Sequence, residues 1–276
     1  MTGPLLGPDG WRYWHLAGGG TVPMPFVLRW LLPQLCRQST RRWSVAWWCS
    51  WPVAAAGMAW WVANRGAGVE VVAASVVLLL GLPGVLGPRV TRPVGVDLPA
   101  MALGLVAAGA WSQGWWWVAL PVVLIAACVR ETTPVWVALW IWSPLPLVAL
   151  VAPLVRRLTA RPGLDPLTDQ QPVLRRVHDH PFRSAIEHRA NRGRDAWLWV
   201  APWGATLAAL WSPSWWLVAV LVVAHVQLVV ATDTVRLLHT SAGPVMAVVA
   251  AETIPVGWLL PVVVAHVVWW HKVERV

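Results

Sequence analysis

Residues 96–129 read VDLPAMALGLVAAGAWSQGWWWVALPVVLIAACV, which is two apolar runs joined by Trp111-Ser112-Gln113-Gly114. Each run holds about fifteen residues, whereas a helix that crosses a bilayer needs roughly 17 to 25. The stretch predicts a tight hairpin of two helices, and the alternative is that one of them is re-entrant.

Apolar runs of this kind fill most of the chain. Of its 276 residues, 58% are hydrophobic and 12% are charged, while soluble domains carry roughly 25% charged residues. Many of the 25 tryptophans flank the runs, where the indole ring suits the headgroup level of a bilayer. The composition predicts an all-α polytopic transmembrane bundle with about eight spans. We expect them at residues 43–63, 69–87, 96–110, 115–129, 135–155, 196–211, 214–232 and 243–270.

The last run is too long for one simple span, and Glu252, Pro255 and Pro261 interrupt it. It predicts either one kinked helix or two half-helices.

Residues 156–195 form the one long polar segment, and its nine arginines place it in the cytoplasm by the positive-inside rule. Counting back from this loop places the N-terminal region outside, although three arginines just before the first span favour the inside.

We therefore expect four regions in a protein of a bacterial-type cytoplasmic membrane. They are an extracytoplasmic loop with an interfacial helix (1–42), five transmembrane helices (43–155), the arginine-rich cytoplasmic loop (156–195) and three further transmembrane helices (196–276).

Other classes of function have little support. The net charge of +9 comes from arginines between apolar runs, so lipid headgroups explain it and nucleic acid is not an expected partner. The three cysteines have no CxxC spacing, and no P-loop, HExxH or GxSxG motif occurs. Lone histidines on apolar helices, His225 and His266, are expected to be hydrogen-bonded core residues. No metal site is predicted at His178, Asp179, His180 and His188, because their spacing matches no zinc pattern.

Charged residues in or near apolar runs are candidate site residues, because charge at membrane depth is costly. Arg130 and Glu131 form either a solvated turn or a polar site at the outer face. Asp233 and Arg236 share a helical face, as a structural ion pair or as an anion-holding site. Glu252 is the acid expected to lie deepest.

The N-terminal region carries a recognisable pattern. In DGWRYWHLAGGG followed by PFVLRWLLPQL, an Asp-Gly and an aromatic cluster precede Arg-x-Leu-Leu-Pro. The matching residues are Asp9, Gly10, Tyr13, Arg29, Leu31, Leu32 and Pro33. This pattern resembles the first extracytoplasmic loop of GT-C-type glycosyltransferases. Weaker likenesses to this group lie at Arg130-Glu131 and at Asp233, Thr234, Arg236, Leu237 and Pro244.

The resemblance implies an enzyme that transfers a sugar from a polyprenyl-phosphate donor to an acceptor at the outer face. It implies that Asp9 is the catalytic base or a metal contact, which leaves a divalent metal cofactor open. Tyr13, Arg29, Arg130 and Glu131 would bind substrate, with Arg29 and Arg130 facing the lipid phosphate. Asp233, Arg236 and Glu252 would form a secondary polar site. Residues 24–36 would form an interfacial helix that ends or kinks at Pro33.

The chain departs from the family pattern in two ways, because no span is expected before Asp9 and the sequence is shorter than that of most members. We therefore expect a reduced relative that is inactive or needs a protein partner. One alternative is a non-catalytic assembly, exclusion or scaffold factor that acts through its tryptophan-rich surface. Another is a small transporter or flippase with Glu252 and His266 along its path. The enzyme requires Asp9, Arg29 and Arg130 to converge beside a lipid-sized groove.

Overall fold

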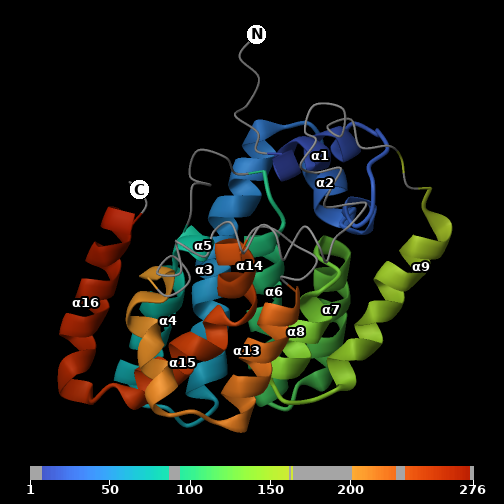
Figure 1. Ribbon diagram of the computed structural model, residues 1–276. Helices are drawn as coiled ribbons and strands as arrows, with labels where there is room; N and C mark the ends of the chain where they lie inside the picture. Colours follow the sequence, from blue (N-terminus) through green and yellow to red (C-terminus); the bar gives the residue numbers. More distant parts are fainter. Residues whose placement is uncertain (1–7, 87–93, 162, 164–200, 228–233, 274–276) are drawn as a thin grey trace. The chain divides into compact units, whose positions relative to one another are not determined.

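A computed structural model of the protein describes residues 8–86, 94–161, 163, 201–227 and 234–273 (Figure 1). The ordered elements in this part of the chain are α-helices and 3-10 helices, without a strand among them. The predicted all-α class is therefore confirmed.

The chain divides into two compact units, one of residues 1–61 and 88–170 and the other of residues 62–87 and 171–276. The first unit contains α1 (Pro8–Ala17), η1 (Phe26–Leu28), α2 (Leu31–Cys36), most of α3 (Thr40–Ala63), α6 (Asp97–Ser112), α7 (Trp116–Val129), α8 (Thr133–Trp140), η3 (Leu145–Leu150) and α9 (Val151–Thr159). The second contains α4 (Val69–Leu80), α5 (Pro83–Leu86), η5 (Ala201–Trp211), α13 (Trp215–Gln227), α14 (Thr234–Ser241), α15 (Gly243–Thr253) and α16 (Val256–Val273).

The predicted helical hairpin is confirmed as α6 and α7, which pack against each other and turn at Gly114 with φ +80°. Helix α6 is almost wholly buried, and small residues let its neighbours approach closely. A Cβ added at Gly57 of α3 would lie 2.8 Å from the backbone nitrogen of Val106. One added at Gly104 would lie 2.9 Å from the ring of Trp140. The hairpin is thus the core of the first unit.

The other apolar runs are helical where the structure describes them, but turns divide several of them. Residues 69–87 hold both α4 and α5, and residues 135–155 hold α8, η3 and the start of α9. The last run forms two helices, because α15 ends before Pro255, which cannot continue its hydrogen-bond ladder. Over the described residues, none of the helices has both the length and the apolar character that crossing a membrane requires. The prediction of about eight spans therefore finds no support in them.

The N-terminal region differs from the predicted helix at residues 24–36. It contains the short η1 and α2, separated at Arg29 and Trp30, and Pro33 lies inside α2. Proline is tolerated there because an N–H in the first turn has no partner within the helix. Helix α2 ends instead at Arg37, whose φ is +50°. The preceding segment, predicted as a loop, forms α1, with Asp9 in its first turn, where a carboxylate suits the helix dipole.

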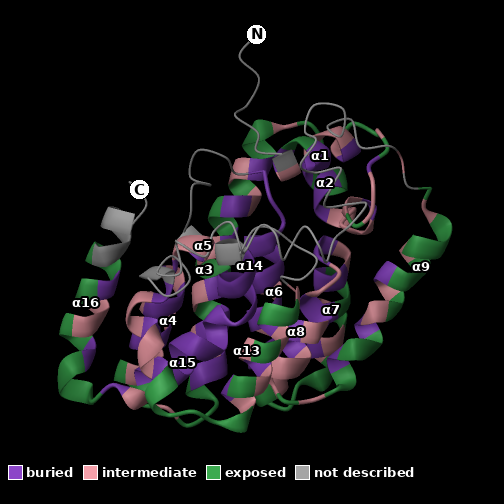
Figure 2. Ribbon diagram, viewed as in Figure 1, coloured by how far each residue is buried: buried purple, intermediate pink, exposed green. Residues whose placement is uncertain are grey.

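Many large apolar residues of both units are exposed, and Figure 2 colours exposed residues green. In the first unit Trp117 is 63% exposed and Leu158 is 79% exposed, and in the second Leu260 is 75% exposed. Helix α9 presents Val151, Leu154, Val155 and Leu158 at successive helical turns, all of them exposed.

Candidate functional site

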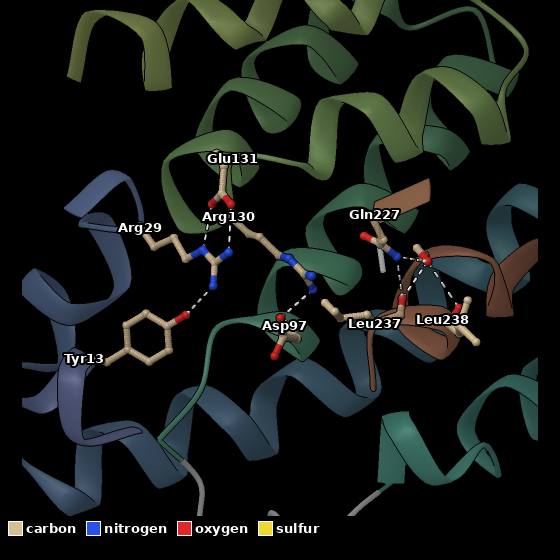
Figure 3. Close-up of polar contacts among 9 residues, drawn as sticks. Tyr13, Arg29, Asp97, Arg130, Glu131, Gln227, Leu237 and Leu238 are labelled. Atoms are coloured by element: carbon tan, nitrogen blue, oxygen red, sulfur yellow. Dashed lines mark hydrogen bonds and ion pairs between the residues drawn. The ribbon is translucent and has the colours of Figure 1, made fainter. Parts of the chain in front are cut away.

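Arg29 joins three parts of the first unit (Figure 3). It lies between η1 and α2, and its Nε and Nη2 each donate a hydrogen bond of 2.7 Å to the carboxylate of Glu131. Its Nη1 donates to the hydroxyl oxygen of Tyr13 on α1, at 2.8 Å. Two parallel N–H···O bonds to one carboxylate are the strongest geometry that an arginine offers. The guanidinium thus fixes α1 and the α7–α8 turn around itself.

A second ion pair lies beside the first and closes the open end of the hairpin. Arg130 follows α7, and its Nη1 lies 2.5 Å from Oδ1 of Asp97, the first residue of α6. Both side chains are at least 95% buried. Since Arg130 and Glu131 are adjacent, the α7–α8 turn contributes one charge of each sign, and each charge has a partner on another element.

Asp9 is linked to Arg29 through Arg12 and the ring of Phe26. Its Oδ1 lies 3.3 Å from Nη1 of Arg12, one turn later on α1. The guanidinium groups of Arg12 and Arg29 lie 4.7 Å and 5.5 Å from the ring centroid of Phe26. The ring of Phe26 also meets Tyr13 edge to face, at 5.5 Å between centroids. Asp9 is the most exposed carboxylate of this group, with 28% of its side chain accessible.

We call Asp9, Arg12, Tyr13, Arg29, Asp97, Arg130 and Glu131 the charge network. Burial is the largest cause that raises the pKa of Tyr13 to about 12, with Asp9 and Asp97 adding to it and Arg29 opposing it. For Glu131 burial favours the neutral acid, but attraction and hydrogen bonds from Arg29, and then Arg130, lower its pKa below the ordinary value. Burial acts to lower the pKa of Arg29, but attraction and hydrogen bonds from Glu131 and Tyr13 outweigh it and raise this pKa well above its ordinary value. At neutral pH Arg29 and Glu131 therefore form an ionised pair, and the phenol of Tyr13 is neutral.

The centre of the network is largely closed to solvent, since the side chains of Arg29 and Glu131 are 12% and 16% exposed. Arg29 uses three of its five N–H groups in the bonds described above, so two can still donate. Tyr13 accepts from Arg29, which leaves its own hydroxyl proton available for donation. The described residues contain no group of three or more His, Cys, Asp or Glu side chains that could hold a metal ion.

Of the five residues assigned to the main site, Tyr13, Arg29 and Glu131 are in direct contact, whereas Arg130 pairs with Asp97 and Asp9 pairs with Arg12. None of the five lines the surface pocket at the α6–α7 turn or the one over α2 and α3. Sequence reasoning missed two members of the charge network, Asp97 and Arg12. Asp97 could have been found, because it begins one helix of the hairpin while Arg130 follows the other, and a hairpin brings these two ends together. Arg12 had only a weak signal, its i, i+3 spacing from Asp9.

The secondary polar site is not assembled among the described residues. Asp233 and the side chain of Arg236 lie outside them, as do His178, Asp179, His180 and His188. Glu252 lies near the end of α15, where its Oε1 is 3.6 Å from Nη2 of Arg65. This pair is well exposed, and the guanidinium of Arg65 also lies over the ring of Trp216.

The two lone histidines have different surroundings. His266 is buried, its Nε2 lies 3.1 Å from the carbonyl oxygen of Leu78, and its Nδ1 accepts a hydrogen bond from the backbone N–H of Ala205. The prediction of a hydrogen-bonded core histidine is therefore confirmed for His266. It is wrong for His225, which is exposed and whose Nδ1 lies 2.7 Å from the carbonyl oxygen of Leu221 in its own helix.

Comparisons of the chain with models of protein families, with curated proteins and with solved structures give no significant match.

Proposed function

We propose that the chain is a membrane-embedded, glycosyltransferase-like protein that transfers a sugar from a lipid-phosphate donor to an acceptor at the outer face. The observation that supports this function best is the charge network. In it Arg29 of the η1–α2 link bonds to Glu131 of the α7–α8 turn, 102 positions away, and to Tyr13 of α1. Five of its seven residues, Asp9, Tyr13, Arg29, Arg130 and Glu131, are those that the resemblance to GT-C-type enzymes assigns to catalysis and substrate binding.

Placement in the membrane is supported by the surface of both units. A soluble monomer seldom exposes apolar area in contiguous patches, yet α9 and α16 present rows of exposed leucine and valine. Tryptophans are exposed at the turn that opens α7, as expected for side chains at headgroup level. We therefore place the protein in a bacterial-type cytoplasmic membrane, with the lipid bilayer as its surroundings.

Each residue then has a chemical role. Asp9 takes the proton of the acceptor hydroxyl as that oxygen attacks the anomeric carbon of the donor sugar. The bond from the sugar to the lipid phosphate breaks, and the phosphate keeps the electron pair. Arg29 donates its remaining N–H groups to the departing phosphate, whose growing charge it stabilises. Tyr13 positions Arg29, and the Asp97–Arg130 pair holds the α7–α8 turn in place.

A transfer assay tests this proposal. Protein in proteoliposomes is supplied with a panel of labelled polyprenyl-phosphate sugars, and transfer to acceptor is measured for the wild type and for Asp9→Asn. Loss of a general base lowers rates by about 10²- to 10⁴-fold, so transfer by the variant should fall at least a hundredfold. Glu70→Gln is the matched control, because Glu70 also lies in the first turn of a helix, in the other unit. Equal transfer by the wild type and Asp9→Asn would remove the catalytic role.

One observation favours a non-catalytic scaffold or assembly factor as the second candidate. In both Arg29–Glu131 and Arg130–Asp97 a guanidinium and a carboxylate neutralise each other, which is also the arrangement of a structural brace. A wild-type protein that folds but transfers none of the donor sugars would support this candidate over the enzyme.

A further inference from the structure

A surface pocket of about 470 Å³ lies over α2 and the first turns of α3. We call it the α2–α3 pocket. Its lining consists of Leu32, Leu35, Cys36, Ser39, Arg41, Arg42, Val45 and Ala46. None of these residues belongs to the charge network, so the pocket is a separate feature of the first unit.

The lining divides into a basic part and an apolar part along α3. Arg41 and Val45 are four residues apart, as are Arg42 and Ala46, so each arginine shares a helical face with an apolar residue one turn later. Leu35 of α2 adds a side chain that is 62% exposed, and Val45 one that is 54% exposed. The pocket therefore offers cations at the start of α3 and an apolar wall directly beyond them.

Among the described residues that line the pocket, none has a carboxylate that could neutralise Arg41 and Arg42. Arg42 is held over the pocket by a hydrogen bond of 3.4 Å from its Nη1 to the carbonyl oxygen of Leu35. The thiol of Cys36 is neutral near pH 7, because burial raises its pKa to about 11, against the opposing effect of Arg42. The pocket thus complements a ligand that has a negative head and an apolar body.

We propose that the α2–α3 pocket binds an anionic phospholipid of the surrounding bilayer. The phosphate meets Arg41 and Arg42, and an acyl chain lies against Leu35 and Val45. This inference rests on the membrane placement of the proposed function, but it does not depend on sugar transfer. Free phosphate makes no contact with the apolar wall. A zwitterionic lipid has no net charge, so two guanidinium groups add little to its binding. The basic and apolar parts of the pocket together therefore favour an anionic lipid.

Occupancy has a consequence for the charge network. Leu32 and Cys36 belong at the same time to the hydrophobic cluster that contains Tyr13 and Trp43. A lipid in the pocket therefore packs against the far side of residues that support Tyr13, and it stabilises α2 in the position that the network requires.

The experiment measures lipid retention by native mass spectrometry on purified protein in detergent, with equal amounts of phosphatidylglycerol and phosphatidylcholine and no sugar donor. The wild type should retain phosphatidylglycerol preferentially. The double variant Arg41→Gln/Arg42→Gln should lose about thirtyfold in affinity for it, since each basic residue near a lipid surface contributes about fivefold. Arg157→Gln/Arg161→Gln removes two exposed arginines elsewhere in the same unit, and it should retain the lipid as the wild type does.

A second variant covers the case in which the double variant does not fold. Val45→Trp fills the apolar part of the pocket from an exposed position, and it should reduce phosphatidylglycerol retention with both arginines in place. Equal retention of the two lipids, or unchanged retention in both variants, would overturn the proposal. So would displacement of the lipid by inorganic phosphate, or by a polyprenyl phosphate that binds in its place. Because no donor sugar is present, a failure here is separate from a failure of the transfer assay.

Discussion

Over the described residues, the first unit buries charged side chains that bond to one another, whereas the buried polar side chains of the second unit are neutral; Figure 3 shows examples of both. The charge network connects side chains from distant segments, as in Arg29–Glu131. In the second unit Gln227 donates to the carbonyl oxygen of Leu237 and to Ser241, and Ser241 donates to the same carbonyl. Hydrogen bonds between neutral groups satisfy the polar side chains of a helical core at little cost. Ionised pairs are costly to bury, so their presence in the first unit suggests a functional role.

The largest effect is expected from breaking the most buried ion pair. Arg130→Gln leaves the carboxylate of Asp97 buried without its cation, and the free energy of unfolding should fall by about 3–5 kcal/mol. Chemical denaturation in detergent measures this loss. The double variant Asp97→Leu/Arg130→Met should recover most of the stability, since replacing both partners by apolar groups is often neutral. A double variant as unstable as the single one would show that the pair does not act as a unit.

The second unit should respond to acid through a buried histidine. His239 accepts a hydrogen bond at Nδ1 from the N–H of Gly84, and burial, followed by repulsion from His266, lowers its pKa to about 3. The unfolded chain binds a proton near the ordinary pKa of 6.5, while the folded chain does not. The stabilisation is therefore complete above that pH and is lost as the pH falls towards the folded pKa.

Between pH 7 and pH 5 this histidine should cost the protein about 2 kcal/mol of its free energy of unfolding. The interval lies above the ordinary range of carboxylates, so the charge network contributes little to it. Denaturation at both pH values measures the difference, and His239→Gln should remove most of it. An unchanged pH dependence in this variant would place the titrating group elsewhere.

Sequence patterns predicted helices and turns in both units, but they did not predict which distant side chains bond to one another. The apolar runs and the polar turn at Gly114 identified the hairpin, and the pattern around Asp9 and Arg29 identified members of the network. The partner of Arg29 is 102 residues away, and no local periodicity indicates it. Helix α1 was missed because its glycine and mixed polarity favour a loop, while burial of Tyr13 and Leu16 against the first unit stabilises it.

An effect smaller than that of Arg130→Gln is expected from removing the hydrogen bond between Tyr13 and Arg29. Tyr13→Phe keeps the ring contacts and removes the acceptor for Nη1, so unfolding should become easier by about 1.5–3 kcal/mol. The same denaturation assay measures it. If the network is a site, the variant should also lose transfer activity beyond what its stability explains, whereas a simple brace would lose stability alone.

The smallest effect is expected at the exposed pair of the second unit. Glu252→Gln removes the partner of Arg65, but both side chains are more than a third exposed, so the free energy of unfolding should change by less than about 1 kcal/mol. A loss as large as that of Arg130→Gln would erase the contrast between the two units.

One variant separates a site from a brace. Arg29→Gln/Glu131→Gln replaces the ion pair by two amides that can still hydrogen-bond, so the free energy of unfolding should stay within about 2 kcal/mol of the wild type. Sugar transfer in proteoliposomes should nevertheless fall at least a hundredfold, because no guanidinium faces the departing lipid phosphate. A folded double variant that transfers sugar as fast as the wild type would contradict the proposed function of the charge network.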